Sequence, residues 1–231
     1  MIELRHVQKI VGQSTVLDIE ALAVGSGEVA AVVGPVGSGK SALLSLLTGQ
    51  SQPTAGTVRV AGLDPTLDHD KVAESVGVLF AEDALYERLT VKGNLAFHCQ
   101  LRGLAADRAD EIIAQVGLSD HAATPASRLP HGLARRLSFG RAILHHPTVL
   151  LLMEPFAGCD AASCVLLARL IRELASVGTT VLVWPQKRLA WPTCARRCMR
   201  CSKAGLSEAM LPRQTSRPSF LSRFPFGSKA R

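Results

Sequence analysis

The chain has 231 residues, 47% of them hydrophobic, and a mean hydropathy of +0.21. This length and composition favour a folded α/β protein with a buried core and exclude a mainly disordered chain. No run of about 18 apolar residues occurs and the N-terminus lacks an apolar signal core, so we expect no membrane span and a cytoplasmic location. The six cysteines are not spaced like those of a small secreted domain, which predicts free thiols.

The net charge of +7 is concentrated at the C-terminal end of the chain. Residues 1–183 hold 15 basic and 18 acidic side chains, whereas residues 184–231 hold 11 basic side chains and one acid, Glu208. This change predicts a folded domain at 1–183 followed by a basic tail at 184–231. We expect the tail to be mostly disordered beyond about Leu189, and the abrupt change could also come from a shifted reading frame.

The hydrophobic pattern predicts strands that alternate with helices along residues 1–183. In chain order we expect an edge strand at 1–10, a buried strand at 27–34, a helix from Lys40 to about Thr48, strands at 56–65 and 74–80, a helical stretch at 90–116 interrupted at Gly93 and Gly103, a helix at 132–146, a strand at 148–153, a helix at 160–178 and a strand at 179–184. This alternation predicts an α/β fold with a largely parallel sheet covered on both faces.

Residues 34–41, with the sequence GPVGSGKS, match the phosphate-binding pattern G-x-x-x-x-G-K-[ST] in full. They follow an expected strand and open an expected helix, so backbone N–H groups and the positive end of the helix dipole can bind phosphate. Lys40 would reach the β- and γ-phosphates, and the Ser41 hydroxyl would ligate Mg²⁺. The predicted nucleotide-binding residues are Gly34, Pro35, Val36, Gly37, Ser38, Gly39, Lys40 and Ser41.

Five segments of the chain, one of which contains this loop, together form a recognisable series of motifs. They are GEVAAVVGPVGSGKSALLSLLTG, TAGTVRVAG, ALYERLTVKGNLAF, RRLSFGRAILHHPTVLLL and EPFAGCD. Over residues 2 to about 183 the chain resembles the ATP-binding domain of ABC transporters, particularly that of small bacterial export systems. The resemblance implies a P-loop NTPase fold with an N-terminal antiparallel β part, a largely parallel core sheet and a helical subdomain at about 82–147. It also implies ATP and Mg²⁺ as cofactors and a head-to-tail homo- or heterodimer bound to the cytoplasmic side of a membrane permease.

Several positions that matter in that family carry a different residue here. The aromatic that stacks on adenine falls at Val11, and the glutamine that links Mg²⁺ to the transporter interface falls at Ala81. The signature sequence reads LPHGL, with Pro130 and His131 in place of a serine and a glycine. Proline lacks an N–H group, and His131 places a side chain where backbone must approach a phosphate closely.

The acids implied at the end of the strand at 148–153 are only partly present. The Walker-B aspartate is replaced by Met153, and a thioether cannot stand in for a carboxylate around Mg²⁺, because hard cations prefer oxygen ligands. Glu154 keeps the position of the general base, although it could also be a merely solvated acid, and Asp160 keeps the acid of the loop that crosses the dimer. The late histidine that touches the γ-phosphate falls at Gln186. We therefore predict weak nucleotide binding with slow or absent hydrolysis.

The sequence leaves three functional classes open. The chain is an ATP-binding subunit on a permease, a non-catalytic structural or regulatory dimer partner, or a decayed relic of such a subunit. A permease would meet residues 82–95, where Tyr86, Leu89 and Val91 are candidate contacts, although Leu89 and Val91 could equally be core residues. The transported substrate cannot be inferred, because the permease selects it.

Two features of the tail have alternative interpretations. Cys194, Cys198 and Cys201 have the C-x₃-C-x₂-C spacing of the cluster motif in radical-SAM enzymes, but the barrel that accompanies that motif is not indicated, so we expect no metal there. The basic run with its aromatic residues could bind nucleic acid or an anionic membrane, yet a run of charge is usually solvated. We do not expect nucleic acid as a partner.

Overall fold

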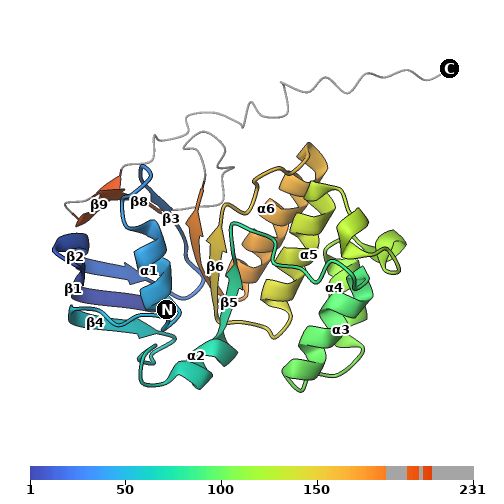
Figure 1. Ribbon diagram of the computed structural model, residues 1–231, viewed down its shortest axis with the longest axis horizontal. Coiled ribbons are helices and arrows are strands. Elements are labelled where there is room, and N and C mark those ends of the chain that lie inside the picture. Colours follow the sequence, from blue (N-terminus) through green and yellow to red (C-terminus); the bar gives the residue numbers. More distant parts are fainter. Residues whose placement is uncertain (186–196, 203–204, 210–231) are drawn as a thin grey trace.

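The computed structural model describes residues 1–185, 197–202 and 205–209, and these form two sheets flanked by helices (Figure 1). A three-stranded antiparallel sheet has the order β2-β1-β4, and a six-stranded sheet has the order β5-β6-β7-β3-β8-β9. The strands are β1 (Ile2–Val11), β2 (Ser14–Val24), β3 (Val29–Val33), β4 (Ala55–Val60), β5 (Val76–Leu79), β6 (Val149–Met153), β7 (Thr180–Trp184), β8 (Arg197–Ser202) and β9 (Gly205–Ala209).

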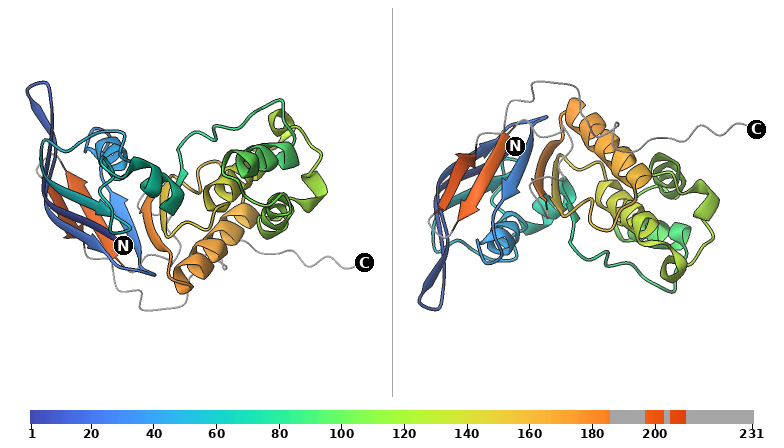
Figure 2. Two further views of the ribbon diagram at one scale, coloured as in Figure 1. Left: turned by 90° about the horizontal axis from the view of Figure 1, so that it is seen from below. Right: turned by 90° about the horizontal axis from the view of Figure 1, so that it is seen from above.

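The helices divide between the two sides of the six-stranded sheet (Figures 1 and 2). They are α1 (Lys40–Leu47), α2 (His69–Ser75), α3 (Val91–Leu101), α4 (Arg108–Gln115), α5 (His131–Ile143) and α6 (Ala161–Ser176), with 3₁₀ turns η1 (Ser119–His121) and η2 (Ala126–Arg128). Helix α1 lies between this sheet and the antiparallel one, whereas α3 to α6 gather beyond β5 and β6. In the described part of the chain, no helix combines the length and the apolar character that crossing a membrane requires.

The core consists of two apolar clusters, one on each face of the parallel strands. On β6, Leu150 and Leu152 pack into the cluster with α3 to α6, whereas Val149 and Leu151 pack into the cluster with α1. All four are fully buried, and burial of such a side chain stabilises the fold by about 1.5–3 kcal/mol. The two-sided burial explains the unbroken apolar runs, and the α/β fold with a largely parallel sheet is confirmed.

Three sequence-based expectations for the elements are wrong. Strand β1 was expected at an edge, but it is central, because it pairs with both β2 and β4. Helix α2 occupies part of the segment where only a strand was expected, at 74–80. Gly93 does not interrupt α3, because it lies in the first turn, where its N–H donates to the Thr90 hydroxyl at 3.0 Å as part of the helix cap.

The expected disorder of the tail is wrong for β8 and β9. Strand β8 pairs in parallel with β3, from Ala30↔Arg197 to Val33↔Arg200, and β9 pairs antiparallel with β8. Without β8 the backbone groups along that edge of β3 would lack partners, and strand pairing satisfies them. Residues 186–196, 203–204 and 210–231 of the expected tail lie outside the described residues, and the domain boundary after residue 183 stays a prediction.

Candidate nucleotide-binding site

The phosphate loop joins the end of β3 to the start of α1 and turns at two glycines. Gly37 and Gly39 have φ angles of +78° and +92°, a region that residues with a side chain rarely adopt. A Cβ atom on Gly39 would lie 2.5 Å from the Val16 carbonyl oxygen, so β2 also requires glycine there. The Ser38 N–H donates to the Pro35 carbonyl at 3.3 Å and closes the turn.

Lys40 and the first turn of α1 give this loop its positive character. The Lys40 ammonium donates to the carbonyls of Gly34 at 2.7 Å and Pro35 at 2.6 Å, so it is folded over the loop. Among the described residues, no side chain caps the start of α1, and no acid lies in its first turn, so the helix itself supplies no anion that would compete for these N–H groups. Ser41 and Val36 are exposed, in line with a loop that is open to a ligand.

The end of β6 lies at the same edge of the sheet as the phosphate loop. Strands β3, β7 and β6 are neighbours and run parallel, so their carboxyl ends share one edge. Met153 is paired in register with Trp184 and packs against the cluster on the α1 side. Glu154 follows with a φ of +46°, and its N–H donates to the Trp184 carbonyl at 2.8 Å, which fixes the chain where the general base is expected.

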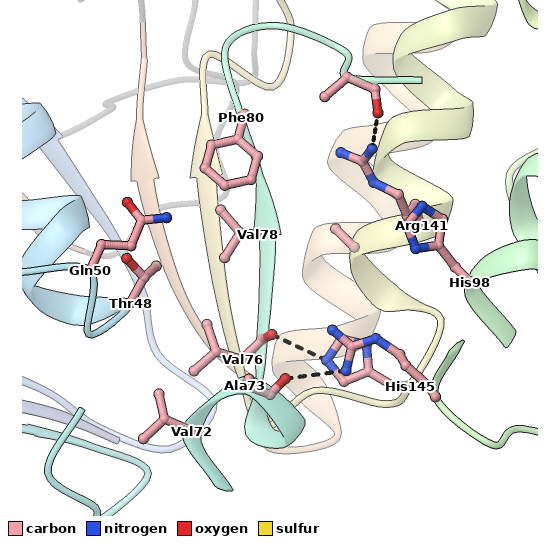
Figure 3. A pocket seen from close by; sticks show the side chains of 13 residues that line it. Thr48, Gln50, Val72, Ala73, Val76, Val78, Phe80, His98, Arg141 and His145 are labelled. Carbon is pink, nitrogen blue, oxygen red and sulfur yellow. Dashed lines mark hydrogen bonds between the residues drawn. The ribbon is translucent and has the colours of Figure 1, made fainter. Parts of the chain in front are cut away.

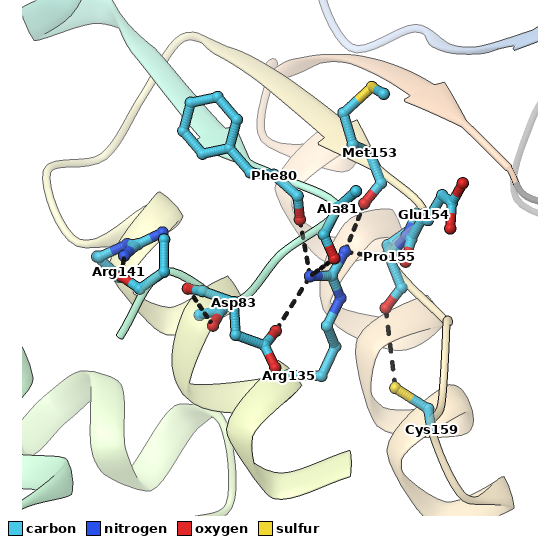
Figure 4. A network of polar contacts seen from close by, with 11 residues as sticks. Phe80, Ala81, Asp83, Arg135, Arg141, Met153, Glu154, Pro155 and Cys159 are labelled. Carbon is cyan, nitrogen blue, oxygen red and sulfur yellow. Dashed lines mark hydrogen bonds and ion pairs between the residues drawn. The ribbon is translucent and has the colours of Figure 1, made fainter. Parts of the chain in front are cut away.

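Arg135, on α5, connects this strand end to the segment after β5 (Figure 4). Its Nη1 donates to the carbonyls of Phe80 at 2.7 Å and Ala81 at 3.3 Å, and its Nη2 donates to those of Met153 and, at 2.9 Å, Glu154. The side chain is completely buried. Sequence reasoning missed Arg135, because nothing in the RR pair of the α5 segment distinguishes a buried arginine from an exposed one.

The start of α5, where the family's signature sequence falls, carries Pro130 and His131 instead of small residues that would leave the backbone accessible. Pro130 precedes the helix without a side-chain cap, and His131 is exposed at its first position. A Cβ atom on Gly158 would lie 2.4 Å from His131 Nδ1, so the imidazole rests directly on the loop after β6. Asp160 of that loop accepts a hydrogen bond from the Ser163 N–H at 2.7 Å and caps α6. Hydrogen bonds from Ser163 lower the pKa of Asp160.

The structure describes some of the other positions that the sequence analysis singled out. Val11 is 59% exposed at the turn between β1 and β2, and Ala81 is exposed after β5. Gln186 and Cys194 lie outside the described residues, and Cys198 and Cys201 fall on β8. Among the described residues, no group of three or more His, Cys, Asp or Glu side chains is placed to hold a metal ion.

A separate cavity of about 370 Å³ opens between β5 and the helices α2, α3 and α5 (Figure 3). Its apolar wall includes Val76, Val78 and Phe80, and its basic wall includes Arg102, Arg141, His98 and His145. Burial, with a smaller contribution from nearby Arg102, lowers the pKa of His145 to about 4, against the hydrogen bond to Val76, which raises it. None of residues 34–41 lines this cavity.

The comparison with known families decides what this arrangement is. The model of the family described as ABC transporter matches residues 17–157, which include the phosphate loop and Glu154. The chain belongs to the ABC transporter family. The resemblance inferred from the motifs is therefore confirmed for the ATP-binding domain of this family.

Curated members of the family match most of this chain. The linearmycin resistance ATP-binding protein LnrL of Bacillus subtilis is 30% identical over 186 residues, which cover 79% of this chain and 60% of that protein. The macrolide export ATP-binding/permease protein MacB of Salmonella typhimurium is 36% identical over 180 residues, which cover 74% of this chain and 28% of that protein. The match therefore spans less than two thirds of either relative.

Solved structures of ABC transporter ATPases share the fold. A structure of an ATP-binding subunit of an ABC transporter superposes with a TM-score of 0.83 at 18% identity, covering 91% of this chain and 90% of that one. The dimeric structure of a bacterial ABC transporter cassette superposes with a TM-score of 0.80 at 23% identity, covering 92% of this chain and 99% of that one. At these identities the likeness concerns the fold.

Proposed function

We propose that this chain is the ATP-binding subunit of an ABC transporter in which nucleotide binding is retained and hydrolysis is slow or absent. The observation that carries the proposal is the contrast between two neighbouring parts of one sheet edge. The phosphate loop, Gly34–Ser41, keeps its turn glycines, its lysine and an uncapped helix start. The end of β6, two strands away, offers Met153 where the family has an aspartate.

Binding of ATP is supported by the geometry of the loop. Lys40 donates to carbonyls of its own loop, and a phosphate could replace these partners without any new burial of charge. Ser38 is buried and its backbone already forms the turn, so the loop is pre-shaped for its ligand. Gly34 to Lys40 would surround the phosphates, and Ser41 would be the hydroxyl nearest to any Mg²⁺ that accompanies them.

Slow hydrolysis follows from the groups that surround that loop. Glu154 could orient the attacking water, but Met153 and Ala81 offer no side-chain oxygen to Mg²⁺. Transfer of the γ-phosphoryl group relies on positioning and on stabilisation of charge, to which Mg²⁺ is central. Loss of one stabilising group commonly costs about 10²–10³ in rate, so the combined loss predicts turnover near background.

The partners that the family membership suggests are a second ATP-binding domain and a membrane permease on whose cytoplasmic face the pair would sit. In a dimer, Pro130 and His131 would face the phosphates bound by the partner. The His131 imidazole, which packs against Gly158, leaves less room for a phosphate at the start of α5. This favours a non-catalytic member of an unequal pair as the second candidate function. Tyr86 is 47% exposed and Leu89 is 36% exposed, so both remain candidate permease contacts, whereas Val91 is fully buried in the core.

Calorimetric titration with ATP, with phosphate release measured in the same sample, tests the proposal. We expect the purified chain to bind ATP with a micromolar dissociation constant and Lys40→Ala to bind it at least about tenfold more weakly. The rate of phosphate release by the purified chain should not exceed that of Lys40→Ala. Lys71→Ala is the control, because Lys71 is an exposed lysine on α2 whose loss should not change binding. Turnover above Lys40→Ala contradicts impaired hydrolysis. Absence of binding contradicts the ATP-binding role and favours a relic.

A further inference from the structure

Two buried hydrogen-bond donors lie at the carboxyl ends of β6 and β7, beside the segment that carries Glu154. Two buried side-chain atoms there have no partner among the described residues, the indole Nε1 of Trp184 and the Nε of Arg135. Each carries an N–H group and has no lone pair to offer a cation. Trp184 is the register partner of Met153, and both side chains belong to the cluster on the α1 side. These two nitrogen atoms therefore offer no ligand to a cation.

Two positive side chains, Arg135 and Lys40, contribute to the charge at this edge. The Arg135 guanidinium lies against the carbonyls of Met153 and Glu154, and it is completely buried. Lys40 adds a second positive charge at the phosphate loop. Figure 4 shows the Met153 side chain pointing away from Arg135, so the thioether takes no part in this network. Asp83 pairs with Arg135 at 3.1 Å and offsets its charge. A divalent cation at the end of β6 would meet Glu154 but not the second carboxylate that Met153 replaces.

The residues present do not fit Mg²⁺. At nucleotide phosphates this ion is usually held by one or two carboxylates together with waters, in near-octahedral geometry. The described chain offers the Ser41 hydroxyl and the single acid Glu154, which the proposed function assigns to the attacking water. Met153 supplies a soft thioether, and Ala81 supplies no side-chain donor at all.

We propose that this site binds the nucleoside triphosphate without requiring Mg²⁺, and that Met153 is the residue that removes the dependence on the metal. The inference rests on the proposed function, because it concerns the same loop. The phosphate charge is met by Lys40 and by the N–H groups that open α1. Mg²⁺ then contributes little to affinity, because Met153 and Ala81 offer it no side-chain oxygen ligand.

Calorimetry on the full chain with ATP as the probe, in buffers of equal ionic strength, tests this directly. One buffer contains excess EDTA and the other contains MgCl₂. We expect the two dissociation constants to agree within about twofold. Tightening by about tenfold or more in MgCl₂ overturns the inference but leaves the nucleotide-binding role intact. Absence of binding in both buffers overturns both proposals, so the two failures are distinguishable.

Two substitutions of Met153 test whether this residue causes the independence of ATP binding from Mg²⁺. Met153→Asp should restore tightening by Mg²⁺ of about tenfold, because it returns a carboxylate to the end of β6. Met153→Leu is the matched control, of similar volume and without an oxygen, and should bind ATP equally with and without the metal. If Met153→Asp is folded by circular dichroism and remains indifferent to Mg²⁺, the role given to Met153 is wrong. The wild-type comparison does not depend on either variant.

Discussion

The Asp83 carboxylate lies 3.1 Å from the Nη1 atom of Arg135, and together they tie α5 to the chain that follows β5. The arginine side chain is 0% exposed and that of Asp83 is 20% exposed, so the pair is almost entirely removed from water. Ser138, one turn further along α5, donates to the Asp83 backbone carbonyl at 2.9 Å. The segment from Phe80 to Asp83 is therefore held to the same helix that supports the end of β6.

Replacement of Arg135 by methionine should destabilise the protein by about 3–5 kcal/mol. The substitution leaves several carbonyls and the Asp83 carboxylate without their shared donor, and an uncompensated buried charge is costly. The free energy of unfolding in urea measures the effect. Arg169→Met is the control, because its ion pair with Glu173 at 3.4 Å is more than half exposed and should contribute under about 1 kcal/mol. Equal losses for the two variants would contradict a buried structural role for Arg135.

Alanine substitutions of Gly37 and Gly39 should distinguish the cost of backbone strain from the cost of a steric clash. Both have a positive φ, which costs alanine about 1 kcal/mol or somewhat more. A Cβ atom on Gly37 meets nothing within 4 Å, whereas one on Gly39 would approach the Val16 carbonyl oxygen to 2.5 Å. We expect Gly39→Ala to lose at least about 2 kcal/mol more than Gly37→Ala in urea unfolding. A smaller loss for Gly39→Ala would show that β2 yields to the added methyl group.

The phosphate loop could be predicted from the sequence because its pattern is local. Eight consecutive residues carry the turn, the lysine and the helix start, so no distant contact is needed to recognise them. The contacts of Arg135 could not be predicted in this way, since they join α5 to residues about 55 and 18 positions away along the chain. The central place of β1 was missed for the same reason, because strand order depends on pairings between distant segments.

The two cysteines around the start of α6 should differ in reactivity. The Cys159 thiol donates to the Pro155 carbonyl at 3.8 Å, and the Cys164 thiol donates to the Cys159 carbonyl at 3.9 Å. The interaction between the two side chains, together with burial, raises the pKa of Cys159, and the same interaction lowers the pKa of Cys164. Because the thiolate is the nucleophile, Cys164 should be alkylated at least about threefold faster than Cys159 at neutral pH. Peptide mapping by mass spectrometry after brief treatment with iodoacetamide measures this. Cys159→Ser should slow the labelling of Cys164 more than Cys99→Ser does, and equal rates would contradict the pairing.

The cavity beside β5 should make the fold sensitive to acid through His145. Its Nε2 lies 3.2 Å from the Val76 carbonyl, its Nδ1 is buried without a partner in the described part of the chain, and mainly burial lowers its pKa from 6.5 to about 4. Between these values the unfolded chain binds more protons than the folded one. Stability is therefore complete above about pH 6.5 and falls progressively as the pH drops toward 4. With its partial exposure taken into account, the loss should be on the order of 1–2 kcal/mol.

Urea unfolding at neutral pH and near pH 4.5 measures this loss for the wild type and for His145→Gln. The glutamine amide can still donate to the Val76 carbonyl but does not titrate in this range, so the variant should lose less stability on acidification than the wild type. His69→Gln is the control, because that histidine is exposed on α2 and should leave the difference unchanged. His98 also has a lowered pKa, caused mainly by burial, so part of the acid sensitivity should persist in His145→Gln. An unchanged pH dependence in His145→Gln would show that this side chain is not responsible.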